Sequence, residues 1–335
     1  MRRRVLFPAL AVLLGIATAL GAAEIVLRLT GHLPRQYVSV DPRIPVLNEP
    51  DHVLGWQPKP GAYLIPPFTA RSKPIRVTVQ ADRSRVTGSP GDRAEKLLLI
   101  GCSFTFGWGV GDEDSFAWKL HDQLPSYDVI NHGVGGYGTY QSLLLLEQML
   151  AQGPPPARVL YGYMQGHEAR NVAHPLWTFS LTKYSRQGLV EVPFCTLDGD
   201  GHLQRRPAEH YPAWPLEGDL AVVNFLEESY MRREAMERTA EAQQVTDLLM
   251  LEMGDLCRRH GVKFAVVLLY ADDAMRDHYS RLLREHDVDL IDCARPLTAE
   301  TRVPGDGHPN ARLHAEWATC IAAALTEKDG AAARG

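Results

Sequence analysis

Three short polar motifs contain residue types that could form a nucleophilic hydrolytic site. The first is Gly101-Cys102-Ser103-Phe104-Thr105-Phe106-Gly107, which directly follows an apolar segment. A serine in such a turn can present its hydroxyl group in a crevice, but the hydroxyl is a weak nucleophile and needs an adjacent base. Alternatively, the same serine is only the N-cap of the helix that follows.

The other two motifs supply what such a serine requires. The loop Asn131-His132-Gly133-Val134-Gly135-Gly136-Tyr137-Gly138 contains four glycines, whose backbone N–H groups can approach an oxyanion closely. A phosphate loop is disfavoured because no Gly-Lys-Ser/Thr follows. The motif Pro304-Gly305-Asp306-Gly307-His308-Pro309-Asn310 places an aspartate two residues before a histidine. His308 could therefore act as a base, with Asp306 orienting its ring.

Short apolar segments alternate with amphipathic ones and predict an α/β fold. The expected strands are 97–100, 127–130, 158–161, 264–269 and 288–291, and the expected helices are 115–124, 139–152, 272–285 and 311–325. This alternation predicts a parallel five-stranded sheet flanked by helices on both faces. Ligands of such sheets bind beyond the carboxyl ends of the strands, where all three motifs fall.

The N-terminal segment 1–30 indicates a membrane anchor or a signal sequence. Met1-Arg2-Arg3-Arg4 precedes 19 uncharged residues, Val5–Ala23. That length is close to the roughly 20 residues that span a bilayer, and the arginines would hold the N-terminus in the cytoplasm. We favour an uncleaved anchor. A signal cleaved at Gly21-Ala22-Ala23 and a buried cytosolic helix are the alternatives. In the first two cases the body of the protein lies outside the cytoplasm.

The remaining chain divides into a lead-in and a main domain. Residues 31–94 are proline-rich, with one expected strand at Ile75–Val79, and we expect them to pack on the main domain, 95–328. An insertion at 173–218 contains an expected hairpin, with strands at Leu189–Val192 and at His202-Leu203 joined by a turn at 198–201. A long helix over 220–259 is expected to follow it. The aromatic residues of the insertion either line an acyl or sugar pocket or form its own core: Trp177, Phe179, Tyr184, Tyr211 and Trp214.

Composition limits the classes of function. The chain has 335 residues, of which 45% are hydrophobic, and a net charge of −5. These values are typical of a globular protein and give no reason to expect a nucleic-acid partner. The cysteines have no metal-ligand spacing, so we expect no metal site. In an oxidising compartment we expect Cys195 to pair with Cys293, and Cys257 and Cys320 to be core residues.

Together, the three motifs resemble those of the SGNH/GDSL hydrolase superfamily over about residues 95–325. The arginine-tipped anchor and proline-rich lead-in are similar to the bacterial membrane-anchored branch. The resemblance implies a flavodoxin-like three-layer fold and no cofactor. It also implies that Ser103 is the nucleophile, His308 the general base and Asp306 the residue that orients the imidazole. The N–H groups of Ser103 and Gly136 would form the oxyanion hole.

Two departures from the family pattern affect the predicted site. Cys102 stands where the family usually has Asp or Asn. The family's third block, Gly-x-Asn-Asp, is replaced by Tyr161-Gly162-Tyr163-Met164-Gln165-Gly166-His167-Glu168. His167 stands in the place of that asparagine, so we expect it either to replace the asparagine as the third oxyanion donor or to mark weakened or altered chemistry. Asn171 is the alternative donor. An imidazole N–H can donate such a hydrogen bond.

These residues predict an extracytoplasmic serine esterase that acts on acyl esters. The acyl group is expected to be short, such as acetyl, and its carrier to be a carbohydrate or a lipid. One alternative is an O-acyltransferase that acts on a cell-envelope polysaccharide through the same acyl-enzyme. The other is a catalytically silent binding module with the same fold, because fold alone does not determine activity.

Overall fold

The computed structural model describes residues 2–36, 42–88, 93, 95–184 and 190–332. In chain order the elements are α1 (Arg2–Leu29), β1 (Asn48–Asp51), β2 (Gly55–Pro58), β3 (Gly61–Ile65), β4 (Ile75–Val79), β5 (Glu95–Gly101), α2 (Ser103–Phe106), η1 (Asp112–Asp114), α3 (Phe116–Gln123), β6 (Tyr127–Gly133), α4 (Thr139–Gln152), β7 (Arg158–Met164), α5 (His167–Asn171), α6 (Pro175–Tyr184), β8 (Val192–Leu197), β9 (Leu203–Glu209), α7 (Ala221–Arg259), β10 (Lys263–Tyr270), α8 (Asp273–Glu285), β11 (Asp289–Asp292) and α9 (Ala311–Ala332).

The central sheet has five strands in the order β11-β10-β7-β5-β6, and every neighbouring pair is parallel. The predicted fold class is therefore confirmed. The three inner strands, β5, β7 and β10, are largely apolar and buried, as expected for a sheet that is covered on both faces. The strand order reverses next to β5, the first strand of this sheet in the chain. Ligands of open α/β sheets bind at such a reversal, beyond the carboxyl ends of the strands.

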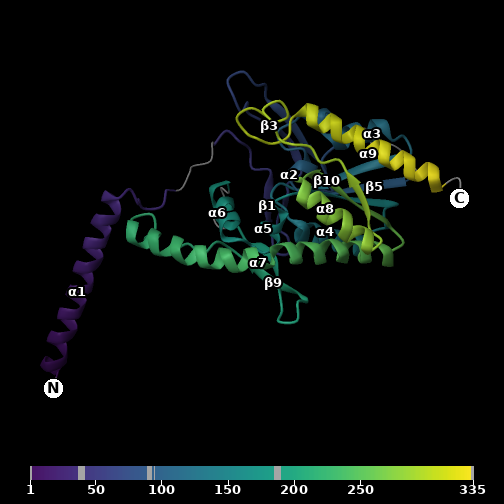
Figure 1. The fold of residues 1–335 in the computed structure, drawn as a ribbon. Helices are drawn as coiled ribbons and strands as arrows, with labels where there is room; N and C mark the ends of the chain where they lie inside the picture. Colours follow the sequence, from purple (N-terminus) through teal and green to yellow (C-terminus); the bar gives the residue numbers. More distant parts are fainter. Residues whose placement is uncertain (1, 37–41, 89–92, 94, 185–189, 333–335) are drawn as a thin grey trace.

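Two helical layers cover the sheet (Figure 1). Leu98 and Ile100 of β5 pack in one core with α4, α7 and α8, whereas Leu97 and Leu99 pack in a second core with α3 and α9. This division follows from the alternation of side chains along a strand. All four leucine and isoleucine side chains are at most 1% exposed. Ser103 thus follows a strand that is fixed from both faces.

The lead-in segment forms two small antiparallel pairs, β1–β2 and β3–β4, and β4 has the bounds that the sequence predicts. Isolated bridges join Val79 to Arg85 and Arg85 to Asn131, so this segment extends the edge of the central sheet beyond β6. Leu54 and Trp56 share a core with residues of the loop after β6. The lead-in therefore packs against the loop that contains Gly136.

The insertion contains α6 and the expected hairpin, β8–β9. Its turn is closed by Asp198, whose Oδ1 accepts hydrogen bonds from the N–H groups of Asp200 (3.0 Å) and His202 (2.9 Å). The strands lie further along the chain than predicted, because β8 begins at Val192, where the first predicted strand ends, and β9 continues to Glu209. Leu189, where the first predicted strand begins, lies outside the described residues. Phe179 contacts Tyr211 with ring centroids 5.1 Å apart, and the guanidinium of Arg35 from the lead-in lies over both rings. These two aromatic residues therefore pack against the lead-in as well as against each other.

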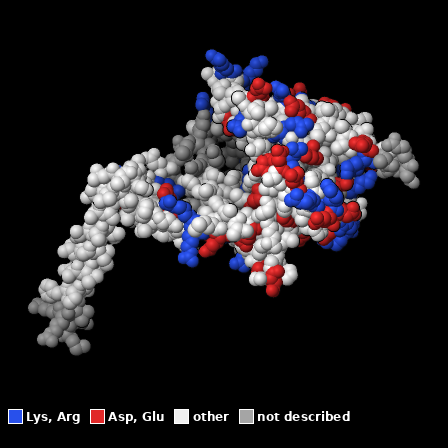
Figure 2. Space-filling model, in the orientation of Figure 1, with Lys and Arg blue, Asp and Glu red and all other residues white. Residues whose placement is uncertain are grey.

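Helix α1 projects away from the body and meets it at the first turn of α7 (Figure 1). Residues Phe7–Leu29 have a mean hydropathy of 2.2 and none of this stretch is buried. In Figure 2 this arm is white along most of its length, whereas charged side chains crowd the body. Glu24 accepts hydrogen bonds from the N–H groups of Ala221 (3.0 Å) and Val222 (2.8 Å), which caps the 39-residue helix α7.

The predicted disulfide between Cys195 and Cys293 is wrong. Cys293 is bonded to Cys320, with their Cα atoms 5.9 Å apart, and Cys195 is a buried free thiol. Cys195 lies in the core on one face of the sheet and Cys293 in the core on the other, so the sheet separates them. The prediction that Cys320 is a core residue is also wrong, because Cys320 is only half-buried and forms this disulfide. Cys257 is buried in the core, as predicted.

Candidate active site

A row of glycines lets the helix that begins with Ser103 sit directly on the ends of the strands. Gly101 of β5 lies opposite Gly133 of β6 and Gly162 of β7. A Cβ atom on any of the three would come within 2.2–2.4 Å of an atom of Thr105 or Phe106, both in α2. Gly101 also has a φ of +149°, which other residues rarely adopt. The glycines therefore determine how closely α2 approaches the sheet.

The structure brings Ser103, His308 and Asp306 together, although Ser103 lies 205 residues before His308 in the chain. The Ser103 Oγ and the His308 Nε2 are 3.1 Å apart. The other ring nitrogen, Nδ1, lies 2.6 Å from the Asp306 Oδ1. Ser103 is 7% exposed and the His308 side chain 31% exposed, so the pair is reachable from the surface. This is the geometry of a serine, a base and an orienting carboxylate.

Asp306 is held as a carboxylate by its neighbours. Burial alone would raise its pKa, but the hydrogen bond and charge of His308, together with the indole N–H of Trp108, lower the pKa below the ordinary value. Trp108 Nε1 donates to the Asp306 Oδ2 at 3.1 Å. Trp108 lies outside the three motifs predicted to form the site. Its position directly after Gly107, at the end of the serine motif, is the only signal that could have identified it.

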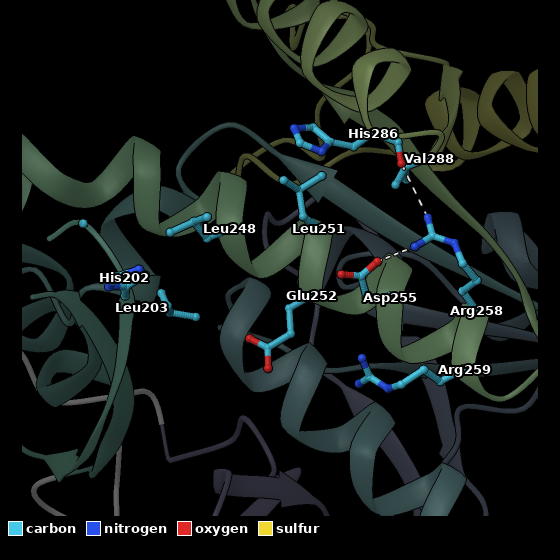
Figure 3. A pocket seen from close by; sticks show the side chains of 11 residues that line it. His202, Leu203, Leu248, Leu251, Glu252, Asp255, Arg258, Arg259, His286 and Val288 are labelled. Carbon is cyan, nitrogen blue, oxygen red and sulfur yellow. Dashed lines mark hydrogen bonds and ion pairs between the residues drawn. The ribbon is translucent and has the colours of Figure 1, made fainter.

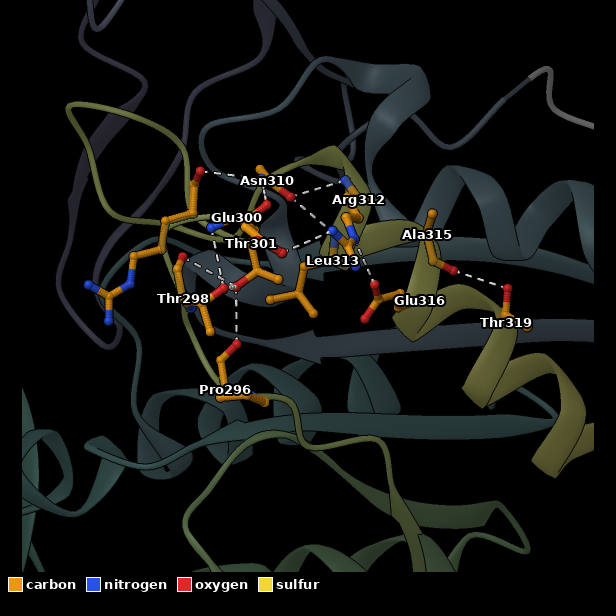
Figure 4. Close-up of polar contacts among 11 residues, drawn as sticks. Pro296, Thr298, Glu300, Thr301, Asn310, Arg312, Leu313, Ala315, Glu316 and Thr319 are labelled. Atoms are coloured by element: carbon orange, nitrogen blue, oxygen red, sulfur yellow. Dashed lines mark hydrogen bonds and ion pairs between the residues drawn. The ribbon is translucent and has the colours of Figure 1, made fainter.

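Asn310 fixes the loop that carries Asp306 and His308 (Figure 4). Its Nδ2 donates to the carbonyl oxygen of Glu300 at 2.8 Å, and its Oδ1 accepts from the N–H groups of Arg312 (3.1 Å) and Leu313 (3.2 Å) at the start of α9. One amide side chain thus caps α9 and ties the loop to the segment before it. The predicted motif therefore contains an anchor as well as the histidine and the aspartate.

The glycine loop after β6 is tied to α2 by Asn131. Its Nδ2 donates to the carbonyl oxygen of Thr105 at 2.9 Å, and its Oδ1 accepts from the N–H of Gly133 at 2.9 Å. Farther along the loop, Gly136 has a φ of +87°, and a Cβ atom there would come within 2.9 Å of Trp56. In the described part of the chain, the N–H groups of Ser103 and Gly136 donate to no protein acceptor. Both remain available for a ligand.

The structure does not support direct donation by His167 to an oxyanion. The residue is 0% exposed, and its Nδ1 lies 2.6 Å from the hydroxyl of Tyr161. Its Nε2 is sealed from solvent and has no partner among the described residues. Burial, followed by the charge of Arg170, places its pKa well below the ordinary value, so the ring is neutral. His167 faces the core because it begins the short helix α5, which packs on α4 and α7.

Asn171, the alternative donor, is also committed to internal contacts. Its Oδ1 accepts from the N–H of Tyr140 at 3.1 Å, and its Nδ2 donates to the hydroxyls of Thr139 (2.9 Å) and Thr246 (2.8 Å). These contacts join α5 to the start of α4 and to α7. The prediction that Asn171 is an oxyanion donor is therefore wrong in this structure.

Arg85 is a structural residue of the site that the sequence analysis missed. Its side chain is 0% exposed, and its guanidinium donates to the carbonyl oxygens of Phe106 and Val110, both at 2.8 Å, and to that of Gly107. It also donates to the Asp112 Oδ1 at 3.2 Å. It therefore holds the chain just after Ser103. Nothing in its local sequence distinguishes it from neighbouring arginines, because its role depends on how the lead-in packs.

A cavity of about 530 Å³ lies elsewhere, between the β8–β9 hairpin, α7 and the turn before β11 (Figure 3). Its lining includes His202, Glu252, Arg258 and His286. Ser103, His308 and Asp306 are not part of the lining. Because His286 and Val288 precede β11, the cavity lies toward the amino ends of the strands. It is therefore separate from the edge of the sheet where Ser103 lies.

No protein-family model matches this chain, and no curated protein matches it. Solved structures with similar folds include a member of the lipolytic G-D-S-L family from Veillonella parvula, with 12% identity and a TM-score of 0.39 over 70% of this chain and 99% of that one. An acetyl xylan esterase from Butyrivibrio proteoclasticus has 12% identity and a TM-score of 0.43, over 78% and 76% of the two chains. A psychrotrophic esterase from a Pseudoalteromonas species has 11% identity and a TM-score of 0.40, over 70% of this chain and 99% of that one. At such distances an activity has to be inferred from this chain's own side chains.

Proposed function

We propose that this protein is a serine esterase that hydrolyses acyl esters through Ser103, His308 and Asp306. The observation that carries the proposal is the continuous hydrogen-bonded chain from the Ser103 Oγ through the imidazole to a carboxylate, with distances of 3.1 and 2.6 Å. A serine hydroxyl becomes a competent nucleophile when a base of this kind adjoins it. A purely structural serine has no need of a histidine oriented by a carboxylate.

Each step of the reaction has a residue to perform it. The Ser103 Oγ attacks the carbonyl carbon of the ester while its proton passes to the His308 Nε2. Cleavage of the ester C–O bond then releases the alcohol, which takes that proton and leaves an acyl group on Ser103. A water molecule then attacks the carbonyl carbon of the acyl-enzyme and gives a proton to the same nitrogen. The bond between that carbon and the Ser103 Oγ breaks, the oxygen takes the proton back from His308, and the carboxylic acid leaves. Asp306 stabilises the charged imidazole during both formation and hydrolysis of the acyl-enzyme.

The oxyanion of the tetrahedral intermediates would be bound by the backbone N–H groups of Ser103 and Gly136. Ser103 is the first residue of α2, so its N–H has no partner within the helix. Gly136 adopts a left-handed conformation that turns the backbone of its loop. Groups of this kind are already oriented before the reaction, which is the usual source of electrostatic stabilisation in acyl transfer.

We also propose that α1 anchors the enzyme in a membrane, with its catalytic domain outside the cytoplasm. The 19 uncharged residues Val5–Ala23 would span the bilayer, and Arg2–Arg4 would stay on the cytoplasmic side. Glu24 and Arg28 then lie at the outer surface, where Glu24 caps α7 and Arg28 donates to the carbonyl oxygen of Asp219, just before α7. A short acyl ester of a carbohydrate or lipid fits such a location.

Labelling with a fluorophosphonate tests the proposal. The full chain, purified in detergent, should become labelled, and Ser103→Ala should abolish labelling. Ser229→Ala, which alters an exposed serine of α7, should label like the wild type. His308→Ala should slow labelling because the hydroxyl loses its base. Folded wild-type protein that does not label, or label that persists in Ser103→Ala, would contradict the proposal.

A further inference from the structure

Arg170 is a half-buried cation beside the proposed oxyanion loop. One of its terminal nitrogens, Nη1, donates to the carbonyl oxygen of Tyr137 at 2.8 Å. Its guanidinium carbon lies 4.6 Å from the ring centre of Trp177. The same indole would be within 3.5 Å of a Cβ atom at Gly136. Arg170 therefore belongs to the wall of the site that adjoins Gly136.

Arg170 has no carboxylate partner among the described residues. Its second terminal nitrogen, Nη2, meets only the sulfur of Met164, at 3.8 Å, which is a weak acceptor. Other buried arginines of this chain differ, because Arg85, Arg158 and Arg238 each meet a carboxylate at 2.8–3.2 Å. A guanidinium presents five donors in a planar fork that matches a carboxylate or phosphate. Most of that capacity is unused here.

The position of Arg170 relative to Ser103 follows from the sheet. Met164 ends β7 and Tyr137 follows β6, and β5 lies between these two strands. A guanidinium that touches both residues lies across the carboxyl end of β5, the strand that leads to Ser103. Along the loop after β6, the N–H of Val134 donates to the carbonyl oxygen of Gly101, and the carbonyl oxygen of Tyr137 accepts from Arg170. Gly136, whose N–H has no acceptor among the described residues, lies between Val134 and Tyr137. Gly136 thus lies between the nucleophile strand and the guanidinium.

We propose that Arg170 binds an anionic group of the substrate, a carboxylate or a phosphate, so that the enzyme prefers esters with a negative charge near the reacting carbonyl. This inference rests on the proposed esterase function. The anionic group can belong to the acyl part or to the alcohol part of the ester. A charged hydrogen bond of this kind changes affinity by about 10- to 100-fold.

Two pairs of esters test the preference. In the acyl arm, p-nitrophenyl hydrogen succinate is compared with p-nitrophenyl butyrate, and in the alcohol arm 4-acetoxybenzoate is compared with its methyl ester. The quantity measured is the ratio of kcat/KM for the anionic ester to that for the neutral one. We expect the wild type to favour the anionic ester in one arm, and Arg170→Gln to reduce that ratio about tenfold. Arg170→Lys should keep part of it, because the charge remains. The matched control Arg233→Gln, on exposed α7 surface, should leave the ratio unchanged.

A binding measurement separates failure of this inference from failure of the esterase proposal. Monomethyl succinate and dimethyl succinate are titrated against Ser103→Ala, with tryptophan fluorescence as the signal because Trp177 lies under the guanidinium. Preference for the monoester that disappears when Arg170→Gln is added supports the inference even if no ester is hydrolysed. Absence of any preference in binding, or equal loss of kcat/KM for both members of each pair, would overturn it.

Discussion

Replacing Gly162 by alanine should disturb Ser103 through the packing of α2 on the sheet. The backbone of Gly162 has a conformation open to alanine, but its Cβ atom would lie 2.2 Å from the Thr105 Oγ1. The next nearest atoms are the Leu269 Cδ1 at 3.1 Å and the Thr105 Cβ at 3.5 Å. Most of the clash is therefore with one hydroxyl oxygen, and Thr105 must move or tilt the helix that begins at Ser103.

The magnitude follows from the burial of this contact. Thr105 is 1% exposed, so it cannot move into solvent, and overpacking of such a site costs about 1–3 kcal/mol. The Thr105 Oγ1 has no hydrogen-bond partner among the described residues. Thr105→Ala alone should therefore change the free energy of unfolding little, because loss of a methyl group is offset by removal of an unsatisfied hydroxyl.

The assay is a double-mutant cycle that measures both thermal unfolding and ester hydrolysis. Each kcal/mol that Gly162→Ala removes from the free energy of unfolding should lower Tm by roughly 2–4 °C. It should also lower kcat by up to about 100-fold, because small displacements of a reacting group are costly. Adding Thr105→Ala should restore both, whereas adding Thr105→Val should restore neither, since valine keeps an atom where the hydroxyl was. If Thr105→Ala fails to restore stability, the clash does not lie where the structure places it.

Three further predictions concern titration and the disulfide. Because the pKa of Asp306 is lowered, its carboxylate stays charged in mildly acidic solution and continues to orient the imidazole. Asp306→Asn should therefore lower kcat for ester hydrolysis by about 10⁴-fold, and a kcat within about tenfold of the wild type would contradict this role. Burial raises the pKa of Glu227 to about 7, above its value in the unfolded chain. The folded state therefore binds this proton more tightly than the unfolded state, and the free energy of unfolding falls as pH rises toward about 7. Glu227→Gln should therefore reduce the fall in the free energy of unfolding between about pH 5 and about pH 8, as measured by denaturant titration at both pH values; an unchanged fall would contradict the raised pKa. Finally, Cys293→Ser should lower the free energy of unfolding by about 3 kcal/mol, because the bond to Cys320 closes a loop with a sequence separation of 27; an unchanged Tm would count against that bond.

Local sequence was sufficient for the elements whose patterns are self-contained. The helix Thr139–Gln152 and the strand Ile75–Val79 have the predicted bounds, because each has one periodicity and distinct flanking residues. The long helix begins at Ala221, one residue after its predicted start, and ends at Arg259 as predicted. Gly261, in a left-handed conformation, follows that end.

Contacts between distant segments could not be predicted in the same way. The cysteine pairing depends on which face of the sheet each thiol reaches, and the chain places Cys195 and Cys293 on opposite faces. Arg85 acts across the boundary between the lead-in and the main domain, so no motif contains it. Ser103, Asp306 and His308 were predictable because parallel strands bring their carboxyl ends to one edge, and each motif follows or adjoins such an end.

The third oxyanion donor shows why a position in an alignment does not establish a role. His167 and Asn171 both lie where the family resemblance expects a donor, yet α5 directs His167 to Tyr161 and Asn171 to Thr139. If two backbone N–H groups bind the oxyanion alone, the site lacks a donor that is typically worth about 10²–10³ in rate. Arg170 is on the same short helix but reaches the other way, toward the glycine loop. An anionic group of the substrate that binds Arg170 supplies binding energy that positions the ester. Charged substrates therefore react faster despite the weaker oxyanion site, whereas neutral substrates gain nothing from it.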